Sequence, residues 1–151
     1  MGERRDNRWM VISVLLTLIS AAVIVCFSGQ DSGQSNTLSR ALVVWILERL
    51  SWEGTPEELE ALNLVLRKLA HFSLYFLLGL GLRGALPKGK KFPAGLAAVL
   101  LGVLFAAGDE FHQRFSQGRT PSGWDVLLDA CGVFAGQAVS AGLRRLREKR
   151  K

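Results

Sequence analysis

The sequence predicts an all-α integral membrane protein, a four-helix bundle with a short interfacial helix between spans one and two. Three observations predict this class. Four long apolar segments are spaced along the chain, basic residues flank them on one predicted side, and ionisable residues gather at their other ends. Hydrophobic residues make up 49% of the 151 residues, close to the globular average, so their distribution carries the prediction.

The clearest segments are residues 9–27 and 92–108, neither of which contains a charge. Nineteen helical residues span about 28 Å, close to the ~30 Å hydrocarbon core of a bilayer. A signal peptide is the alternative for the first segment, because Arg4, Arg5 and Arg8 precede it. Its length exceeds a typical signal-peptide core, and Cys26-Phe27-Ser28 is a poor cleavage site, so we expect a membrane anchor.

Two further segments, 69–86 and 124–143, are apolar but carry polar residues. Read alone, they would also fit buried helices of a soluble protein. Beside two strong spans they are better interpreted as membrane helices whose polar side chains, such as His71 and Asp129, face the bundle interior.

The connection between spans one and two predicts two helical features. Residues 41–50 form a short apolar pattern with Trp45 and Arg49, typical of a helix at the membrane interface. Thr55-Pro56-Glu57-Glu58 is a capping box that starts a helix running into span two.

The basic residues predict the orientation. With four spans, thirteen of the 19 Lys and Arg residues fall on one side, which the positive-inside rule makes cytoplasmic. We therefore expect a cell-membrane protein with a cytoplasmic N-terminus (1–8), a four-span domain (9–143) and a basic cytoplasmic tail (144–151). The tail suits anionic lipid headgroups, and no nucleic-acid module accompanies it, so we expect no nucleic-acid partner.

Three polar clusters lie at the ends of spans two, three and four. Arg67, His71 and Tyr75 are spaced i, i+4, i+8 and share one helix face. The second cluster follows the third span. If the helix of this span continues, we expect Asp109, His112 and Gln113 on one side of it and Glu110 and Arg114 on another.

The third cluster runs from Arg119 to Asp125 and Asp129, and continues on the same helix face to Gly132 and Gly136. That glycine spacing lets a neighbouring helix approach closely. Because the spans alternate in direction, we expect all three clusters to converge on the non-cytoplasmic side.

In this order the motifs resemble the VanZ-like family. The resemblance covers residues 9–143 and rests on the following matches: Phe27-Ser28-Gly29-Gln30, Arg67-Lys68-x-x-His71-Phe72-x-x-Tyr75, Asp109-Glu110-x-x-Gln113-x-Phe115, Arg119, and Asp125-x-x-x-Asp129-x-x-Gly132-x-x-x-Gly136. Asp129 stands where the family often has Asn. The resemblance implies a multi-pass bacterial membrane protein of the cell envelope. The namesake of the family is associated with low-level teicoplanin resistance, but the resemblance does not imply a particular reaction.

Two interpretations of the clusters remain open at this stage. Opposite charges would pair simply to let helices dock in a bilayer, or the network forms a functional site. For a site, His71, Asp109 and Glu110 are the catalytic candidates. The ligand-binding candidates are Arg67, Lys68, Tyr75, Gln113, Arg119, Asp125 and Asp129.

We expect no metal and no cofactor from the sequence. The residue types are suitable ligands, but no pair forms a tight motif such as HExxH, and basic neighbours compete for the carboxylates. The chain also lacks the sequence signatures of known membrane enzymes. Pro121-Ser122-Gly123 lacks the following His of lipid phosphatases, Asp125-x-x-x-Asp129 lacks the upstream half of the CDP-alcohol phosphotransferase motif, and no serine elbow occurs.

The favoured function is recognition of an anionic or lipid-linked envelope molecule at an outward-facing polar site, with a link to glycopeptide resistance implied by the resemblance. An enzyme acting on a lipid-linked precursor or phospholipid is one alternative. The other is a non-catalytic partner of a membrane protein, with Gly132 and Gly136 as the helix contact. Membrane lipids are expected partners in each case.

Overall fold

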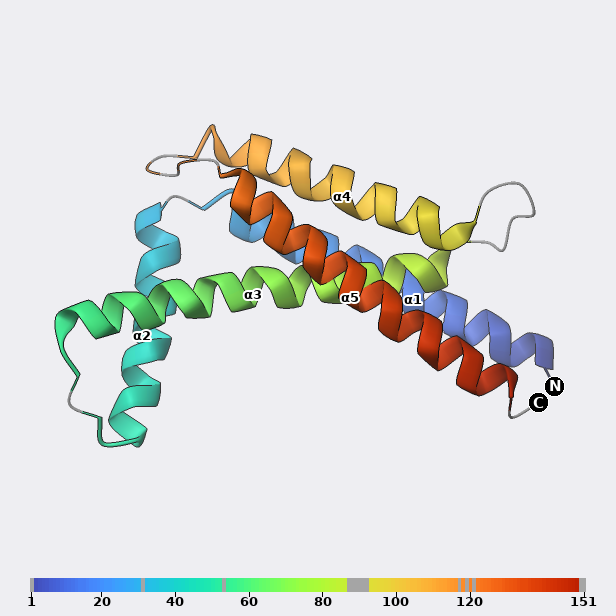
Figure 1. Cartoon of the computed structure of the whole chain (residues 1–151), viewed down its shortest axis with the longest axis horizontal. Helices are drawn as coiled ribbons and strands as arrows, with labels where there is room; N and C mark the ends of the chain where they lie inside the picture. Colours follow the sequence, from blue (N-terminus) through green and yellow to red (C-terminus); the bar gives the residue numbers. More distant parts are fainter. Residues whose placement is uncertain are drawn as a thin grey trace.

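The computed structural model describes residues 2–30, 32–52, 54–86, 93–116, 118, 120 and 122–149, and in these ranges the chain is all-α. Five helices follow one another (Figure 1): α1 (Gly2–Ser28), α2 (Ser32–Arg49), α3 (Pro56–Ala85), α4 (Ala94–Gln113) and α5 (Gly123–Glu148). All but α2 are long and apolar enough to cross a membrane, so the predicted four spans are confirmed.

The helix between the first two spans is longer than predicted. It was expected over 41–50, and α2 begins at Ser32. The additional turns are polar and carry no apolar periodicity, so the sequence did not reveal them. Contacts with α3 accompany them: Asn63 donates a hydrogen bond to Asn36, and Arg40 forms an ion pair with Glu60 at 2.9 Å.

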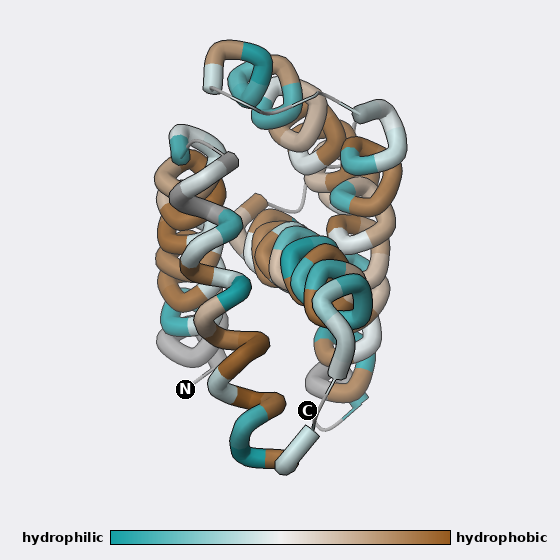
Figure 2. Tube along the Cα trace, turned by 90° about the vertical axis from the view of Figure 1, so that its left-hand side faces the viewer, coloured by the Kyte–Doolittle hydropathy of each residue, from teal (hydrophilic) through white to brown (hydrophobic). Residues whose placement is uncertain are grey.

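Helix α3 is the centre of the molecule and packs against each of the other four helices. Figure 2, viewed from the α2 end, shows α3 running through the middle with hydrophilic residues at its near end. Its 30 residues are about 45 Å long, well beyond the ~30 Å hydrocarbon core. The first third of α3 therefore projects past the core, and α2 crosses it there (Figure 1).

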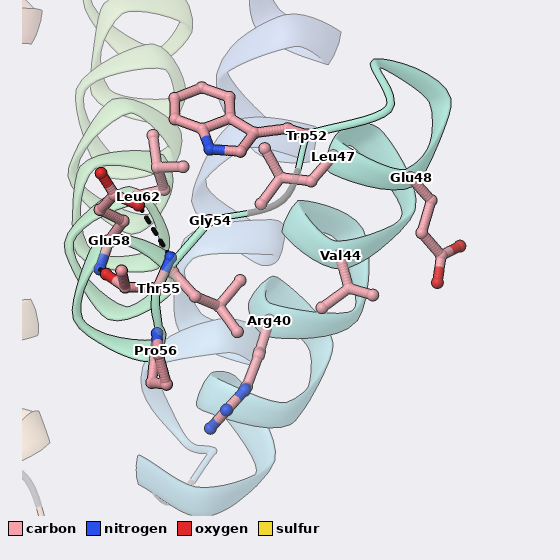
Figure 3. Close-up of a pocket in the computed structure, with 11 residues that line it drawn as sticks. Arg40, Val44, Leu47, Glu48, Trp52, Gly54, Thr55, Pro56, Glu58 and Leu62 are labelled. Atoms are coloured by element: carbon pink, nitrogen blue, oxygen red, sulfur yellow. Dashed lines mark hydrogen bonds between the residues drawn. The ribbon is translucent and has the colours of Figure 1, made fainter.

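The predicted capping box starts α3. The Thr55 hydroxyl accepts a hydrogen bond from the Glu58 backbone N–H at 3.3 Å, and the Glu58 carboxylate accepts one from the Thr55 N–H at 2.8 Å. The indole of Trp52 lies over this first turn beside Leu62 (Figure 3). These contacts fix where the connection from α2 enters the bundle.

The closest helix pair is α3 and α5, and glycines make it so. A Cβ added at Gly132 would lie 2.6 Å from the Phe72 carbonyl oxygen, and one added at Gly136 would lie 2.7 Å from the Leu80 nitrogen. The close approach predicted from this spacing is thus made within the chain. A helix from another protein would have to displace α3 from these glycines.

The outer faces of the spans are strongly apolar. Leu18 and Ile19 of α1, Leu104 of α4 and Phe134 of α5 are each more than half exposed. Such surface is costly in water and is the normal contact surface for lipid acyl chains. The chain is a multi-pass membrane protein.

Candidate functional site

The three polar clusters meet at the bundle end that lies away from both termini (Figure 1). Helices α1 and α4 end there, α5 begins there, and α3 passes through. A cavity of about 90 Å³ opens between α3, α4 and α5 and is lined by Leu64, Arg67, Lys68, His71, Glu110, Gln113, Asp125, Leu128 and Asp129.

At the floor of this cavity, the half-buried imidazole of His71 lies beside two buried carboxyl groups. His71, Asp109 and Asp129 each offer a ligand atom within 4.8 Å of the other two. Asp129 is 1% exposed and Asp109 is 7% exposed. The Nδ1 atom of His71 is 3.7 Å from Oδ1 of Asp129, which is an ion-pair distance but too long for a hydrogen bond.

Two polar side chains surround this group. Gln113 donates a hydrogen bond from Nε2 to Oδ2 of Asp109 at 3.1 Å, one turn along α4. Tyr75 is fully buried one turn after His71, and its ring packs 6.4 Å from that of Phe105. Within the described residues the Tyr75 hydroxyl makes no hydrogen bond, although it lies within electrostatic reach of Asp109 and Asp129.

The cavity mouth holds the remaining charges. The Lys68 ammonium of α3 pairs with the Asp125 carboxylate of α5. Glu110 of α4 accepts a hydrogen bond from the backbone N–H of Ser122 at 2.5 Å, just before α5 begins. A carboxylate is well placed there, because the beginning of a helix has unpaired N–H groups and a partial positive charge. Helices α3 and α4 are thus each tied to the beginning of α5 by a polar contact.

The predicted convergence is confirmed for Arg67, His71, Asp109, Glu110 and Asp125. Arg119 was predicted to join them and lies outside the described residues. Whether any of these residues binds a ligand or catalyses a reaction stays a prediction.

The predicted faces of α4 were partly wrong. Glu110 was placed away from Gln113, but both are buried and line the same cavity. His112 was placed beside Gln113, but it is exposed, and its Nδ1 lies 3.2 Å from the Ser28 hydroxyl of α1. The reason is that a neighbouring helix covers each side of α4: α5 meets Glu110, and the end of α1 meets His112.

The sequence analysis did not predict the contacts that Ser28 and Ser122 form at this end of the bundle. Ser28 accepts a hydrogen bond at its backbone oxygen from Ser116 and approaches His112 with its side chain. Ser122 holds Glu110 through its backbone, which no side-chain pattern can reveal. Ser28 lies in the Phe27-Ser28-Gly29-Gln30 motif, so a signal for it was present.

Electrostatically, the site contains more acid than base. Its described residues include four carboxylates, at Asp109, Glu110, Asp125 and Asp129, and two permanently charged bases, Arg67 and Lys68. Such a site can hold a cation at its buried floor and present basic groups to an anion at its mouth.

Comparison with known proteins places the chain in a family. The VanZ/LLP1 family profile matches residues 13–144, which include spans two and three, most of spans one and four, and every residue that lines the cavity. No curated protein and no solved structure matches the chain. The chain belongs to the VanZ/LLP1 family.

Proposed function

We propose that this protein binds the anionic headgroup of an amphiphilic, lipid-linked envelope molecule in the cavity between α3, α4 and α5. The observation that carries the proposal is the position of this charged, open cavity along the length of the membrane-spanning helices. Arg67 lies 18 residues before the end of α3 at Ala85, about 27 Å along the helix axis. That distance is close to one hydrocarbon thickness, so the cavity mouth lies where lipid headgroups meet acyl chains.

The residues at the mouth provide the contacts. Arg67 and Lys68 supply donors for an anionic oxygen, and the pairing of Lys68 with Asp125 holds its ammonium in place. Glu110 fixes the beginning of α5 beside them. Arg119, which precedes α5 in the sequence, is proposed as a third base. Apolar Leu64 and Leu128 line the same cavity and suit the first part of a lipid chain.

The proposed site faces outward, with both termini in the cytoplasm. The basic residues of the termini and of the connection after α3 support this orientation, since the positive-inside rule places them in the cytoplasm. An envelope molecule with an external headgroup would then reach the cavity laterally from the outer leaflet. The link to glycopeptide resistance rests on the family resemblance alone.

A second candidate function is turnover of the bound amphiphile. It is favoured by the half-buried His71 beside the carboxyl groups of Asp109 and Asp129 and by Glu110 at the mouth, a combination suited to general acid–base catalysis. Incubation of the purified protein with a polyprenyl phosphate, followed by mass spectrometry of the lipid, tests it. A product formed by the wild type and absent with Glu110→Gln is the expected result of an enzyme; unchanged lipid contradicts turnover.

Native mass spectrometry tests the binding proposal directly. A polyprenyl phosphate and the matching neutral polyprenol differ only in the charged group. We expect the phosphate to bind the wild type at least ten times more tightly, and Lys68→Met to lose most of this preference. Lys149→Met, which removes the same charge from the exposed tail, is the matched control and should keep it. Equal affinity for the two lipids would contradict the proposal.

A further inference from the structure

Among the described residues, the floor of the site holds two carboxyl groups that no basic side chain of Lys or Arg balances. Within the described residues, Lys68 pairs with Asp125 and Ser122 satisfies Glu110, but neither Asp109 nor Asp129 forms an ion pair with Lys or Arg. An unpaired carboxylate in a low-dielectric interior is strongly unfavourable. Two such carboxylates beside one imidazole call for a compensating cation.

Asp129 provides an independent observation. It is 1% exposed, and neither of its carboxylate oxygens has a hydrogen-bond partner among the described residues. Buried polar atoms in folded proteins are almost always satisfied, so oxygens left unsatisfied in this way indicate a ligand of their own. The Asp129 carboxylate lies in one group with the donor atoms of His71 and Asp109.

The spacing of the donors fits a single ion. Two atoms that each lie ~2.1 Å from a tetrahedrally coordinated metal are about 3.4 Å apart. The His71 Nδ1 to Asp129 Oδ1 separation is 3.7 Å, and no pair within the group exceeds 4.8 Å. A small contraction of the side chains would place all three donors in a coordination shell.

We propose that His71, Asp109 and Asp129 bind one divalent transition-metal ion, such as Zn²⁺ or Mn²⁺, whose open position takes an oxygen of the anionic headgroup. The role of the open position rests on the proposed function, whereas the metal site itself rests on the donor set. An imidazole nitrogen favours transition metals over Ca²⁺ and Mg²⁺, which prefer all-oxygen sites. Three protein ligands with one position left open is the usual arrangement of a reactive metal centre.

Further contacts of the group would support the ion. Gln113 holds Asp109 from outside the proposed coordination shell, as second-shell hydrogen bonds do in metal sites. A metal-bound His71 would no longer act as a general base, so in the enzymatic alternative that role would pass to Glu110. The sequence did not predict this site because its donors come from α3, α4 and α5, and no two of them form a local motif.

Metal content tests the inference. Full-length protein with its purification tag removed is isolated without chelator, and its metals are measured by inductively coupled plasma mass spectrometry. We expect about one Zn²⁺ or Mn²⁺ per chain in the wild type and a decrease of at least tenfold in Asp129→Asn. Glu57→Gln removes an exposed carboxylate in the first turn of α3, outside the cavity and the proposed ligand set, and should keep its metal.

Thermal unfolding makes the test independent of correct metal loading during expression. After chelation and dialysis, Zn²⁺ or Mn²⁺ should raise the unfolding midpoint of the wild type and of Glu57→Gln but leave Asp129→Asn unchanged. Asp129→Asn is nearly isosteric and removes a buried charge, so in chelator it should be at least as stable as the wild type. A metal-free wild type with no midpoint shift, or equal metal binding by Asp129→Asn, would overturn the inference.

The same samples separate this inference from the proposed function. If the wild type binds metal but does not distinguish polyprenyl phosphate from polyprenol, the metal site stands and headgroup recognition fails. If it distinguishes the two lipids equally well with and without chelator, and binds no metal, headgroup recognition stands and the metal site fails.

Discussion

At the scale of single residues, the site contains buried polar atoms that lack hydrogen-bond partners among the described residues. Asp129 and Tyr75 are almost completely buried, yet the Asp129 carboxylate and the Tyr75 hydroxyl make no hydrogen bond within the described part of the chain. By contrast, Gln113 and Glu110 in the same cluster have defined donors or acceptors. Charges that serve only to dock helices would be paired with one another, so the unpartnered atoms favour a site that awaits a ligand.

Tyr75→Phe tests this contrast. Because the hydroxyl has no hydrogen-bond partner in the described residues, its removal should change the free energy of unfolding by less than about 1 kcal/mol. Thermal unfolding in detergent measures the change. The binding of polyprenyl phosphate should weaken if the hydroxyl donates to the bound headgroup. A large loss of stability would instead show that Tyr75 holds the core through its hydroxyl.

At the scale of helices, the contact between α3 and α5 sets the geometry of the site. His71 and Asp129 face each other because Gly132 and Gly136, which follow Asp129 on α5, allow the two backbones to come close. The sequence predicted this close approach, but not which helix would make it. At the cavity mouth, the Lys68–Asp125 pair joins the same two helices.

Gly136→Ala should therefore destabilise the bundle. Its Cβ would lie against the Phe76 carbonyl oxygen and 2.7 Å from the Leu80 nitrogen, and backbone atoms cannot move aside as a flexible side chain can. We expect a loss of about 1–3 kcal/mol in unfolding free energy. Gly142→Ala on the same helix is the matched control, because nothing lies within 4 Å of its added Cβ. Equal stability of both variants would contradict the packing account.

At the scale of the whole molecule, one end of the bundle is chemically different from the other. The polar cavity lies at the end away from both termini, while most basic residues belong to the termini and to the connection after α3 (Figure 1). By the positive-inside rule, this asymmetry favours the orientation that we propose, with the cavity on the external side. The first third of α3, which leads to the cavity, contacts α2 through the hydrogen bond between Asn63 and Asn36.

Reporter fusions test the orientation. Fusions after Lys91 or Lys151 should read cytoplasmic, because both positions lie in basic segments. Insertions near Asp31 and Gly118 should read external. A cytoplasmic signal at Gly118 would reverse the assignment of the site and leave an envelope headgroup unable to reach it.

Much of the fold follows from the sequence, because length and hydropathy define spans and the Thr55 capping box defines a helix start. The convergence of the clusters also follows, since spans must alternate in direction. The extra turns of α2 and the neighbours of Glu110 and His112 do not follow. They depend on tertiary contacts, such as Asn36 with Asn63 and Glu110 with the Ser122 backbone, that leave no periodic pattern in the chain.

The central claim is that the charges at the cavity mouth recognise a ligand and do more than dock helices. Replacing Lys68 or Asp125 alone leaves a charge without its partner, whereas the double replacement Lys68→Met with Asp125→Leu removes the pair and keeps similar side-chain volumes. If the pair only docks α3 against α5, the double variant should recover both folding and full lipid binding.

The decisive measurement is the affinity of this double variant for polyprenyl phosphate, determined by native mass spectrometry beside its thermal unfolding midpoint. We predict a midpoint close to that of the wild type, together with loss of most of the preference for the phosphate over the neutral polyprenol. A folded double variant that retains the full preference would contradict the account and leave the pair as a docking contact between helices.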